Sequence, residues 1–454
     1  MTSHIPDLVA AIAQFARSPN DVVALLHAVS PVVIPPNMTP PPPATILDAY
    51  MASFTRHLSP NVATVAEIDR VAEATGVVWL VQRADRRLRL CAFVALGAAS
   101  MTSITVDERL SDSHGRRVGC LLRLCSGLEH ASLPLQPALL EAALSASQVR
   151  ALSLCPPLRG HPLQGVDHIT HWLASAGNGH LSLQMLRDAT NIDLAQALTS
   201  SPHLARLSLH HCEGLVGTLM ANGARFCGVT ELFVSDIVGT HAHDLLLPLL
   251  RLPAMTTLSI KVNNPGPVTG LATALPQLEA LQELLLARVH LLDVGAMPVS
   301  VQPTIRTLTF DRVLFTPRSL SHLLDWVTRS AHLDSISFPF CTYFQDHPIC
   351  AAQALWRSLH AGGRFISFTS CSLITLDVQI MVRRLRETHV RHRAQVDLTF
   401  NPFRLQGIQA LACALSTCTN VSIKVRCSRE LLLQVTHAGI RLEETEDGAW
   451  LHSP

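Results

Sequence analysis

The sequence predicts an α/β solenoid in the form of a horseshoe, with a parallel β-sheet on the concave face and helices on the convex face. Two observations lead to this prediction. The phrase L-x-x-L-x-L recurs along most of the 454 residues, and the intervals between copies stay between 21 and 30 residues. The residues between copies carry the spacing of apolar positions that is typical of a helix. One such unit cannot bury its own apolar face, so the units must stack on one another.

Each copy is anchored on the first position of its phrase. The strong copies begin at Val149, Leu204, Val229, Met255, Leu281, Ile305 and Leu333. Weaker copies begin at Thr75, Met101, Leu128, Asn178, Gly363, Arg393 and Cys418. We therefore expect about 14 units in the solenoid of residues 75–442, each made of a strand, a turn, a helix and a return segment.

One copy carries a fuller pattern than the others. Its pattern positions are Val396, Asp397, Leu398, Asn401, Gly407, Leu411, Ala414 and Leu415. This segment resembles one whole unit of the ribonuclease-inhibitor type of leucine-rich repeat, and the resemblance implies the leucine-rich repeat horseshoe. Three cysteines fall at the position of Asn401 in their own units: Cys212, Cys341 and Cys371. We expect side chains at this position to bond backbone groups that stacking would otherwise bury unpaired.

The N-terminal residues do not follow the repeat. An apolar-Pro-acid-apolar entry at Ile5-Pro6-Asp7-Leu8 opens one helix, Pro19 ends it, and Asn20 or Asp21 can cap a second helix. Residues 1–30 resemble the start of an F-box, the helical module that binds the Skp1 adaptor of a ubiquitin ligase. The resemblance implies an adaptor-binding set of Ile5, Pro6, Leu8, Ile12, Val22 and Leu25.

The F-box ending, Val-Cys-x-x-Trp, is missing, since the chain runs into Ser30-Pro31. The alternative is therefore a helical hairpin that caps the solenoid. Beyond this head, we expect a Pro-rich linker at residues 31–43, a helical cap at residues 44–74 that seats the first unit, and a solvated acidic tail at residues 443–454.

Composition narrows the class of protein. The formal net charge is +1, which gives no overall field for nucleic acid, and charged residues make up only 15% of the chain. The 12 cysteines include no C-x-x-C pair and are expected to be reduced. No signal peptide or membrane span is recognisable. We expect a cytoplasmic protein, with the nucleus as the alternative compartment.

The sequence offers no catalytic motif. It lacks a Gly-rich phosphate loop, a G-x-S-x-G and an H-E-x-x-H motif, so we expect neither an enzyme nor a cofactor. The run His210-His211-Cys212-Glu213 has the residue types of a metal site. Adjacent residues on a strand point to opposite faces, however, so the two histidines are not expected to converge and no metal is expected.

Binding is expected on the concave face, where the positions between the apolar residues of each phrase point outward. The candidate partner-binding residues are Arg206, His210, Glu231, Phe233, Lys261, Glu283, Leu285 and Asp311. Phe233 and Leu285 are apolar where solvent is expected, so they are candidate anchors for a protein target. The alternative for both is packing against neighbouring side chains on the same face.

Together the two resemblances imply substrate recognition in an SCF-type ubiquitin ligase of the F-box and leucine-rich repeat kind. The head would bind the Skp1-like adaptor and the concave face would bind the target. One alternative is a leucine-rich repeat scaffold or adaptor without a link to ubiquitin. A third hypothesis is a regulator resembling the Ran GTPase activator, which shares this repeat type but carries a long acidic tail.

Overall fold

The computed structural model describes residues 103–106 and, with short gaps, residues 115–155, 165–184, 191–237, 254–426 and 435–454. The expected F-box-like head, the Pro-rich linker and the helical cap all lie outside the described residues. The same holds for the six adaptor-binding candidates between Ile5 and Leu25 and for the unit anchored at Thr75. The chain divides into two compact units, which meet in the sequence between Ala205 and Arg206.

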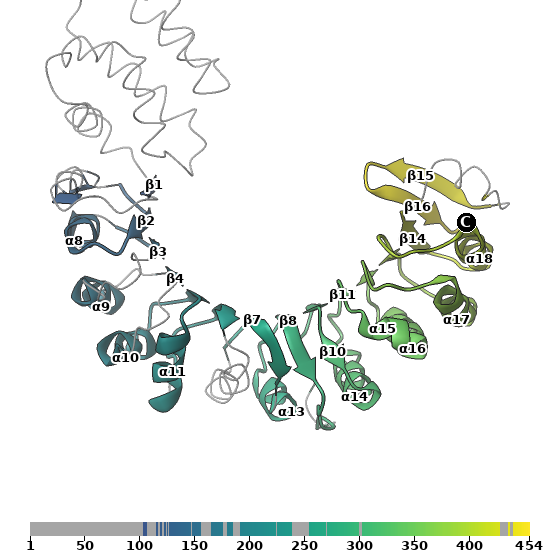
Figure 1. The fold of residues 1–454 in the computed structure, drawn as a ribbon, viewed down its shortest axis with the longest axis horizontal. Coiled ribbons are helices and arrows are strands. Elements are labelled where there is room, and N and C mark those ends of the chain that lie inside the picture. The colour runs from purple at the N-terminus through teal and green to yellow at the C-terminus, as the bar shows by residue number, and fades with distance from the viewer. Residues whose placement is uncertain are drawn as a thin grey trace, which may run out of the picture. The chain divides into compact units, whose positions relative to one another are not determined.

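The first unit alternates parallel strands with helices (Figure 1). Its described strands pair in chain order: β1 (Ser103–Thr105), β2 (His130–Pro134), β3 (Ala151–Cys155) and β4 (His180–Gln184). Three helices follow the last three of these strands: α8 (Pro137–Ala146), α9 (Val166–Ala174) and α10 (Ile192–Ser200). Asn191 caps α10, because its side chain accepts a hydrogen bond from the Leu194 amide.

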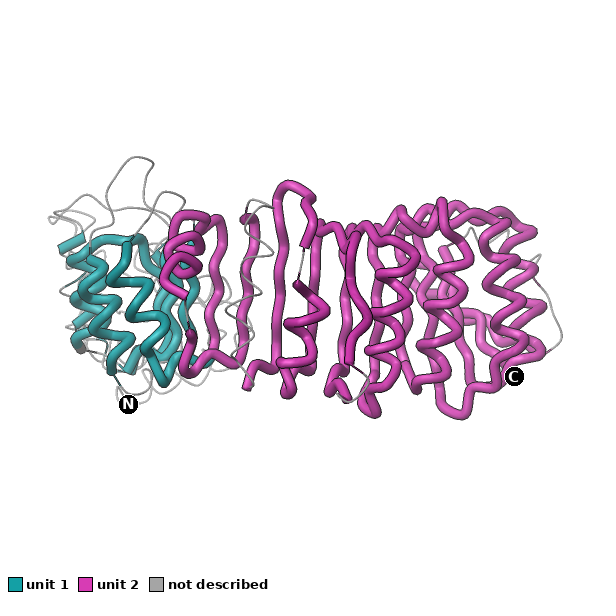
Figure 2. Tube along the Cα trace, turned by 90° about the horizontal axis from the view of Figure 1, so that it is seen from below, with its two compact units in different colours: residues 1–205 teal, residues 206–454 magenta. Residues whose placement is uncertain are grey.

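The second unit has the same alternation over more repeats, and Figure 2 shows its coils side by side in a row. Its parallel strands are β5 (Arg206–His210), β6 (Glu231–Ile237), β7 (Thr257–Pro267), β8 (Glu283–Leu291), β9 (Thr307–Asp311), β11 (Ser335–Ser337), β12 (Phe365–Ser367), β13 (Ala394–Asp397) and β14 (Val421–Val425). The short strand β10 (Leu314–Phe315) pairs with β8.

The helices of the second unit lie on one face of its sheet (Figure 1). They are α11 (Glu213–Ala221), α13 (Leu271–Ala274) with the 3-10 turn η3 (Leu275–Gln277), α14 (Pro317–Val327), α15 (Tyr343–Asp346), α16 (Pro348–His360), α17 (Thr375–Arg386) and α18 (Leu405–Leu415). Strands line the inner side of this unit and helices the outer side. We call the sheet face opposite the helices the open face.

The predicted strand positions are confirmed. Each strand from β1 to β9, and also β11 and β12, begins two residues after the anchor predicted for its unit. The last copy differs, because Val396 pairs with Ile423 and the anchor position is therefore Asn420 rather than Cys418. The residues Val421, Ile423 and Val425 are all buried, so apolar spacing fits both registers.

Aromatic side chains build the centre of the second unit's core. Phe310, Phe338 and Phe368 hold the same position in three consecutive repeats, and their rings stack with centroids 5.6 and 5.3 Å apart. Phe344 meets the last two rings edge-on, at 5.1 and 5.3 Å. Stacked and edge-on pairs are the favourable aromatic geometries, so this stack joins neighbouring repeats as well as filling them.

The C-terminal residues differ from the solvated tail that the sequence predicted. Strands β15 (Arg441–Thr445) and β16 (Gly448–His452) form an antiparallel hairpin, and β16 pairs antiparallel with β14. Ala449 and Leu451 of β16 are buried, which is why this segment packs against the sheet. The acidic residues Glu443 and Glu444 lie on β15, whose residues are all exposed, so the charges themselves remain in solvent as expected.

The stacked rings predict a large effect of one core substitution. Replacing Phe338 by Ala should lower the free energy of unfolding by about 3–5 kcal/mol, because it leaves a cavity beneath the rings of Phe310, Phe344 and Phe368. Phe340, which is 45% exposed, provides the matched control. Its replacement by Ala should change the free energy by about 0.5 kcal/mol or less. Urea unfolding followed by circular dichroism measures both values, and equal losses would contradict the assigned core.

Candidate functional site

The open face of the second unit brings together the residues that the sequence proposed for partner binding. Three rows cross strands β5 to β9 in register, and each row takes the residues that alternate with buried ones. The first row runs Arg206, Glu231, Thr257, Glu283 and Thr307. The second runs Ser208, Phe233, Ser259, Leu285 and Thr309. The third runs His210, Ser235, Lys261, Ala287 and Asp311. All eight candidate residues therefore lie on one continuous patch of sheet.

The proposed anchors are less exposed than a free apolar side chain would be. Phe233 and Leu285 are both of intermediate burial. The Arg206 guanidinium lies over the Phe233 ring, 4.5 Å from its centroid, and its Nη1 is 3.5 Å from Glu231 Oε2. Phe233 thus packs against a neighbour on the face, which was the alternative to an anchor, although part of its surface stays open. The Arg206 guanidinium that covers the ring, and the Glu231 carboxylate beside it, can still contact a partner.

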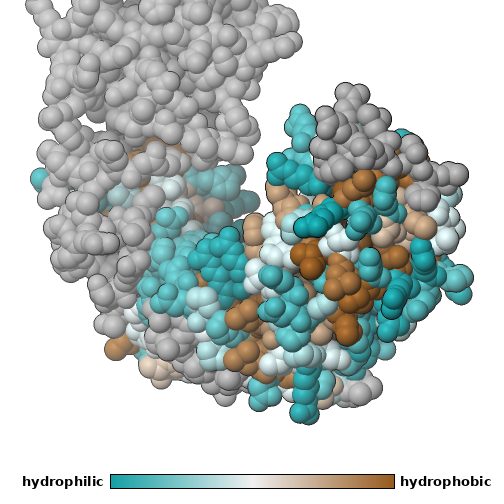
Figure 3. All heavy atoms as spheres, turned by 45° about the vertical axis from the view of Figure 1, so that its right-hand side comes forward, coloured by the Kyte–Doolittle hydropathy of each residue, from teal (hydrophilic) through white to brown (hydrophobic). Residues whose placement is uncertain are grey.

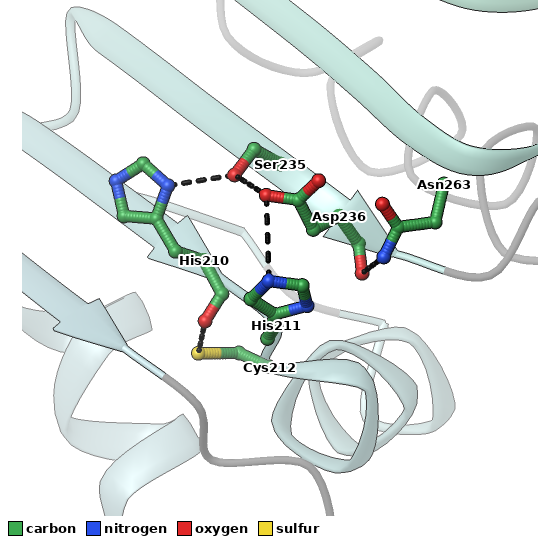
Figure 4. A network of polar contacts seen from close by, with 6 residues as sticks. All are labelled: His210, His211, Cys212, Ser235, Asp236 and Asn263. Carbon is green, nitrogen blue, oxygen red and sulfur yellow. Dashed lines mark hydrogen bonds and ion pairs between the residues drawn. The ribbon is translucent and has the colours of Figure 1, made fainter. Parts of the chain in front are cut away.

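A network of polar contacts links the ends of β5 and β6 (Figure 4). His210 Nδ1 is 2.7 Å from Ser235 Oγ, and Ser235 Oγ donates to Asp236 Oδ2 at 2.9 Å. His211 Nε2 lies 3.6 Å from the same carboxylate oxygen. The Asn263 side chain donates to the Asp236 carbonyl at 3.1 Å, which ties this network to β7.

The expectation that His210 and His211 cannot converge is wrong. Strand β5 ends at His210, and His211 adopts φ 52°, outside the extended geometry on which that expectation rested. Both rings therefore reach the Ser235–Asp236 pair from neighbouring backbone positions (Figure 4). In the described ranges, no group of three or more His, Cys, Asp or Glu side chains is placed to hold a metal ion.

The network is arranged to hold the face in place rather than to activate a nucleophile. The Ser235 hydroxyl gives its hydrogen to Asp236, so His210 Nδ1 must carry the hydrogen of their contact. A histidine that acts as a general base needs the opposite arrangement, in which the serine donates to the imidazole. Burial lowers the pKa of His210, the nearby Asp236 opposes this shift, and His211 and Lys261 add to it. The lowered pKa favours the neutral form of the His210 ring.

A second set of contacts lies inside the stack and confirms the expected role of the repeated Cys or Asn position. The Cys341 thiol donates to the Phe310 carbonyl at 3.0 Å, and Cys371 donates to Phe338 at 2.8 Å. Each acceptor belongs to the preceding repeat. Burial raises the pKa of Cys371 to about 12, so this thiol stays protonated and available as a donor.

Asn401 fills the same position in the next repeat and makes more contacts. Its Nδ2 donates to the carbonyls of Phe368 at 2.8 Å and Leu398 at 2.9 Å, and its Oδ1 accepts from the Leu373 amide at 3.0 Å. Cys212 bonds within its own turn, donating to the His210 carbonyl at 3.2 Å. These side chains fix each turn that follows a strand, so they also fix the edge of the open face.

The sequence interpretation missed the residues that follow the strands at this edge. The residue seven after the anchor has positive φ in most of these repeats: His211, Asp236, Arg288, Arg312, Phe340, Ser370 and Phe400. Two of them, Phe340 and Phe400, are among the exposed large apolar residues. The position of these residues, seven after each anchor, was predictable from the sequence alone. The left-handed backbone that projects these side chains was not, because none of the residues is a glycine.

In comparisons with known proteins, no family model and no curated protein matches the chain. Among the helices that the structure describes, none is long and apolar enough to cross a membrane.

The half-buried His210 predicts how stability changes with pH. The unfolded chain holds His210 at an ordinary pKa of about 6.5, whereas the folded chain lowers it. The unfolded state therefore binds more protons, and stability should fall as the pH drops through about 6.5 towards the folded pKa. The substitution His210→Gln should reduce this loss, as measured by the midpoint of urea unfolding at pH 7.5, 6.5 and 5.5.

The exposed His332 supplies the control for this measurement. His332→Gln should leave the pH dependence of the midpoint as it is in the unsubstituted chain. An identical pH dependence in the His210 and His332 variants would show that the network does not hold His210 neutral.

Proposed function

We propose that the chain is a leucine-rich repeat scaffold whose open face binds a protein target. One observation carries the proposal: the three in-register rows of side chains across β5 to β9 are covered by none of the helices that the structure describes in the second unit. Six of the fifteen residues in these rows are Ser or Thr. Larger side chains stand among them, namely Arg206, His210, Glu231, Phe233, Lys261, Glu283 and Leu285.

The chemistry of the rows supports a protein target over a small charged ligand. The face carries both cations and carboxylates, and two of them, Arg206 and Glu231, already pair at 3.5 Å. A mixed, neutral surface of this kind can match the mixed polar and apolar surface of a protein. A single-sign cluster, which a phosphate or a metal ion would need, does not form along these rows.

The finer proposal is substrate recognition in an SCF-type ubiquitin ligase. It is supported by the sequence of the head alone, where Ile5-Pro6, Leu8 and Asp21-Val22 match the F-box pattern. The mechanism is that of a scaffold, because the adaptor held by the head and the target held by the open face would be brought close together. Such an arrangement raises the effective concentration of the target and needs no chemistry of its own.

Photo-crosslinking tests the open face. A benzophenone side chain in place of Leu285, in the middle row, should give discrete adducts with a protein target in cell extract. The same group in place of Gln379, exposed on α17 of the helix-covered side, should not. Reversing two charges beside it, with Lys261→Glu and Glu283→Lys, should weaken target binding about fivefold to tenfold. Adducts of equal yield at both positions, or indifference to the reversals, would remove the open face as the binding surface.

A pull-down with purified Skp1 tests the head. The full chain should retain Skp1, and deletion of residues 1–30 should abolish retention. The double substitution Val22→Asp and Leu25→Asp should act like the deletion, because charges would replace the apolar contact surface. Lys261→Glu, on the open face, should leave Skp1 binding unchanged. A folded full chain that does not retain Skp1 would leave the scaffold proposal and overturn the ligase proposal.

A further inference from the structure

Five neighbouring strands of the second unit end in a symmetric series of side chains. In the order β9, β11, β12, β13 and β14, the residues one to three positions beyond the strand ends are Arg312, Phe340, Ser370, Phe400 and Arg426, of which Arg426 lies one residue before the position that the other four share. The series therefore has an arginine at each end, a phenylalanine next to each arginine, and a small serine in the middle.

The backbone fixes the first four of these residues in one repeated conformation. Arg312, Phe340, Ser370 and Phe400 have φ values of 53°, 56°, 56° and 58°. Their amides bond in succession to the next strand: Arg312 to the Pro339 carbonyl at 2.9 Å, Phe340 to Thr369 at 2.9 Å and Ser370 to Thr399 at 3.0 Å. The side chains consequently leave the edge in parallel, at the spacing of the strands.

The two arginines cover the outer faces of the two rings. The Arg312 guanidinium lies 4.9 Å from the Phe340 centroid, and the Arg426 guanidinium lies 4.5 Å from the Phe400 centroid. Each arginine comes from the strand on the far side of its ring from Ser370. The inner ring faces are thus turned towards the strand of Ser370 and towards each other. Phe340 is 45% exposed and Phe400 is 50% exposed, so these ring surfaces face solvent.

We call the space between the inner faces of the Phe340 and Phe400 rings the slot. Its width determines which side chain fits into it. Strands lie about 4.8 Å apart, so two strand steps place the rings about 10 Å apart. A flat ring between them, in contact with both at about 3.8 Å, would fill only about 7.6 Å. A branched aliphatic side chain is wider by about 2.5 Å, the distance between its two methyl carbons, and fills the whole gap.

Charge at the two ends selects the flanking residues. A guanidinium that stacks on a ring can still donate to a carboxylate from the N–H groups in its own plane, and in Arg312 only Nε lies near a carboxylate, 3.8 Å from Asp311 Oδ1. The two guanidinium groups lie about 19 Å apart by the same strand spacing, which a peptide in the extended polyproline II conformation spans in about six residues. Because this conformation has about three residues per turn, acidic residues three positions before and three positions after the aliphatic residue lie on its face of the peptide and would meet the two arginines.

Exposed rings beside arginines also suit single-stranded nucleic acid, whose bases stack on aromatic faces. Two observations favour a peptide. The outer ring faces already carry guanidinium groups, and the inner faces are too far apart for one base to touch both. One carboxylate also lies close by, because Asp311 Oδ1 is 3.8 Å from Arg312 Nε. A phosphate chain carries a negative charge at every step, whereas the peptide needs one carboxylate at each arginine and can be uncharged in between.

We propose that Phe340, Ser370 and Phe400, with Arg312 and Arg426 at the ends, form a docking slot for an extended acidic segment of a partner protein. A branched aliphatic side chain of that segment enters between the two rings. The inference rests on the proposed function as a protein-binding scaffold, and it names the chemistry of a partner. Figure 3 shows apolar surface gathered in patches among polar side chains on the part of the second unit that faces the viewer.

The test uses the full chain and a labelled peptide of sequence Gly-Glu-Ser-Ser-Leu-Ser-Ser-Glu-Gly, with binding followed by fluorescence anisotropy. Saturable binding is expected. Phe400→Ala should weaken it at least tenfold, because an anchor pocket loses one wall. Ser370→Trp should abolish it by filling the slot. Ile192→Ala, which removes a side chain that is 55% exposed in the first unit, should have no effect.

Charge exchange separates docking from a folding defect. The double variant Arg312→Glu and Arg426→Glu should lose the acidic peptide and gain the peptide in which both Glu residues are replaced by Lys. A variant that merely folds poorly would bind neither peptide. No binding by the folded chain, equal binding by Ser370→Trp, or failure of the Lys peptide to rescue would each overturn the slot.

Two further outcomes keep the alternatives apart. If labelled single-stranded oligouridine binds instead, and Phe400→Ala removes that binding, the surface is a nucleic-acid site and the proposal is wrong. If crosslinking at Leu285 captures a target while the peptide never binds, the slot is overturned and the scaffold function stands.

Discussion

In the second unit, each described repeat contributes one strand to the run from β5 to β14, and the short β10 alone lies off this run. A single strand cannot satisfy its own backbone. Its amides and carbonyls find partners only in the strands before and after it, in the register seen from β5 to β14. The constraint extends past the strands, since Cys341, Cys371 and Asn401 bond carbonyls of the preceding repeat from within the turn. The register of each strand is therefore set by its neighbours, and this register determines where the outward side chains of each repeat lie.

Much of the fold followed from apolar spacing, because spacing is the property that stacking constrains. The anchors placed the strands from β1 to β9, and also β11 and β12, correctly, and the weak copy at Gly363 was among them. Spacing could not fix the last register, since three alternate buried residues, Val421, Ile423 and Val425, fit two alignments. Apolar spacing also could not place the C-terminal hairpin. The residues of β15 are all exposed and show no apolar alternation, and the alternation in β16 covers only five residues.

The candidate site shows a similar division. Outward positions on the strands followed from alternation, so all eight candidates share the open face. The contacts between them did not follow, because they depend on left-handed residues such as His211 and Asp236 just past the strands. The same backbone feature explains why Phe340 and Phe400 escaped notice. A sequence pattern records which residues recur, whereas the direction of a side chain depends on a dihedral angle that non-glycine residues seldom adopt.

The two strands at the C-terminal end have a consequence for assembly. The last strand of a parallel sheet of repeats has unpaired backbone N–H and C=O groups along its outer edge, and another chain can pair with them. Here the chain direction reverses at β16, and β15 presents a short, fully exposed strand bearing Glu443 and Glu444. Any incoming strand would have to accept the reversed polarity and bring its backbone against these carboxylates. The hairpin thus acts as a terminator of sheet growth, so this edge resists the end-to-end polymerisation to which its architecture is prone.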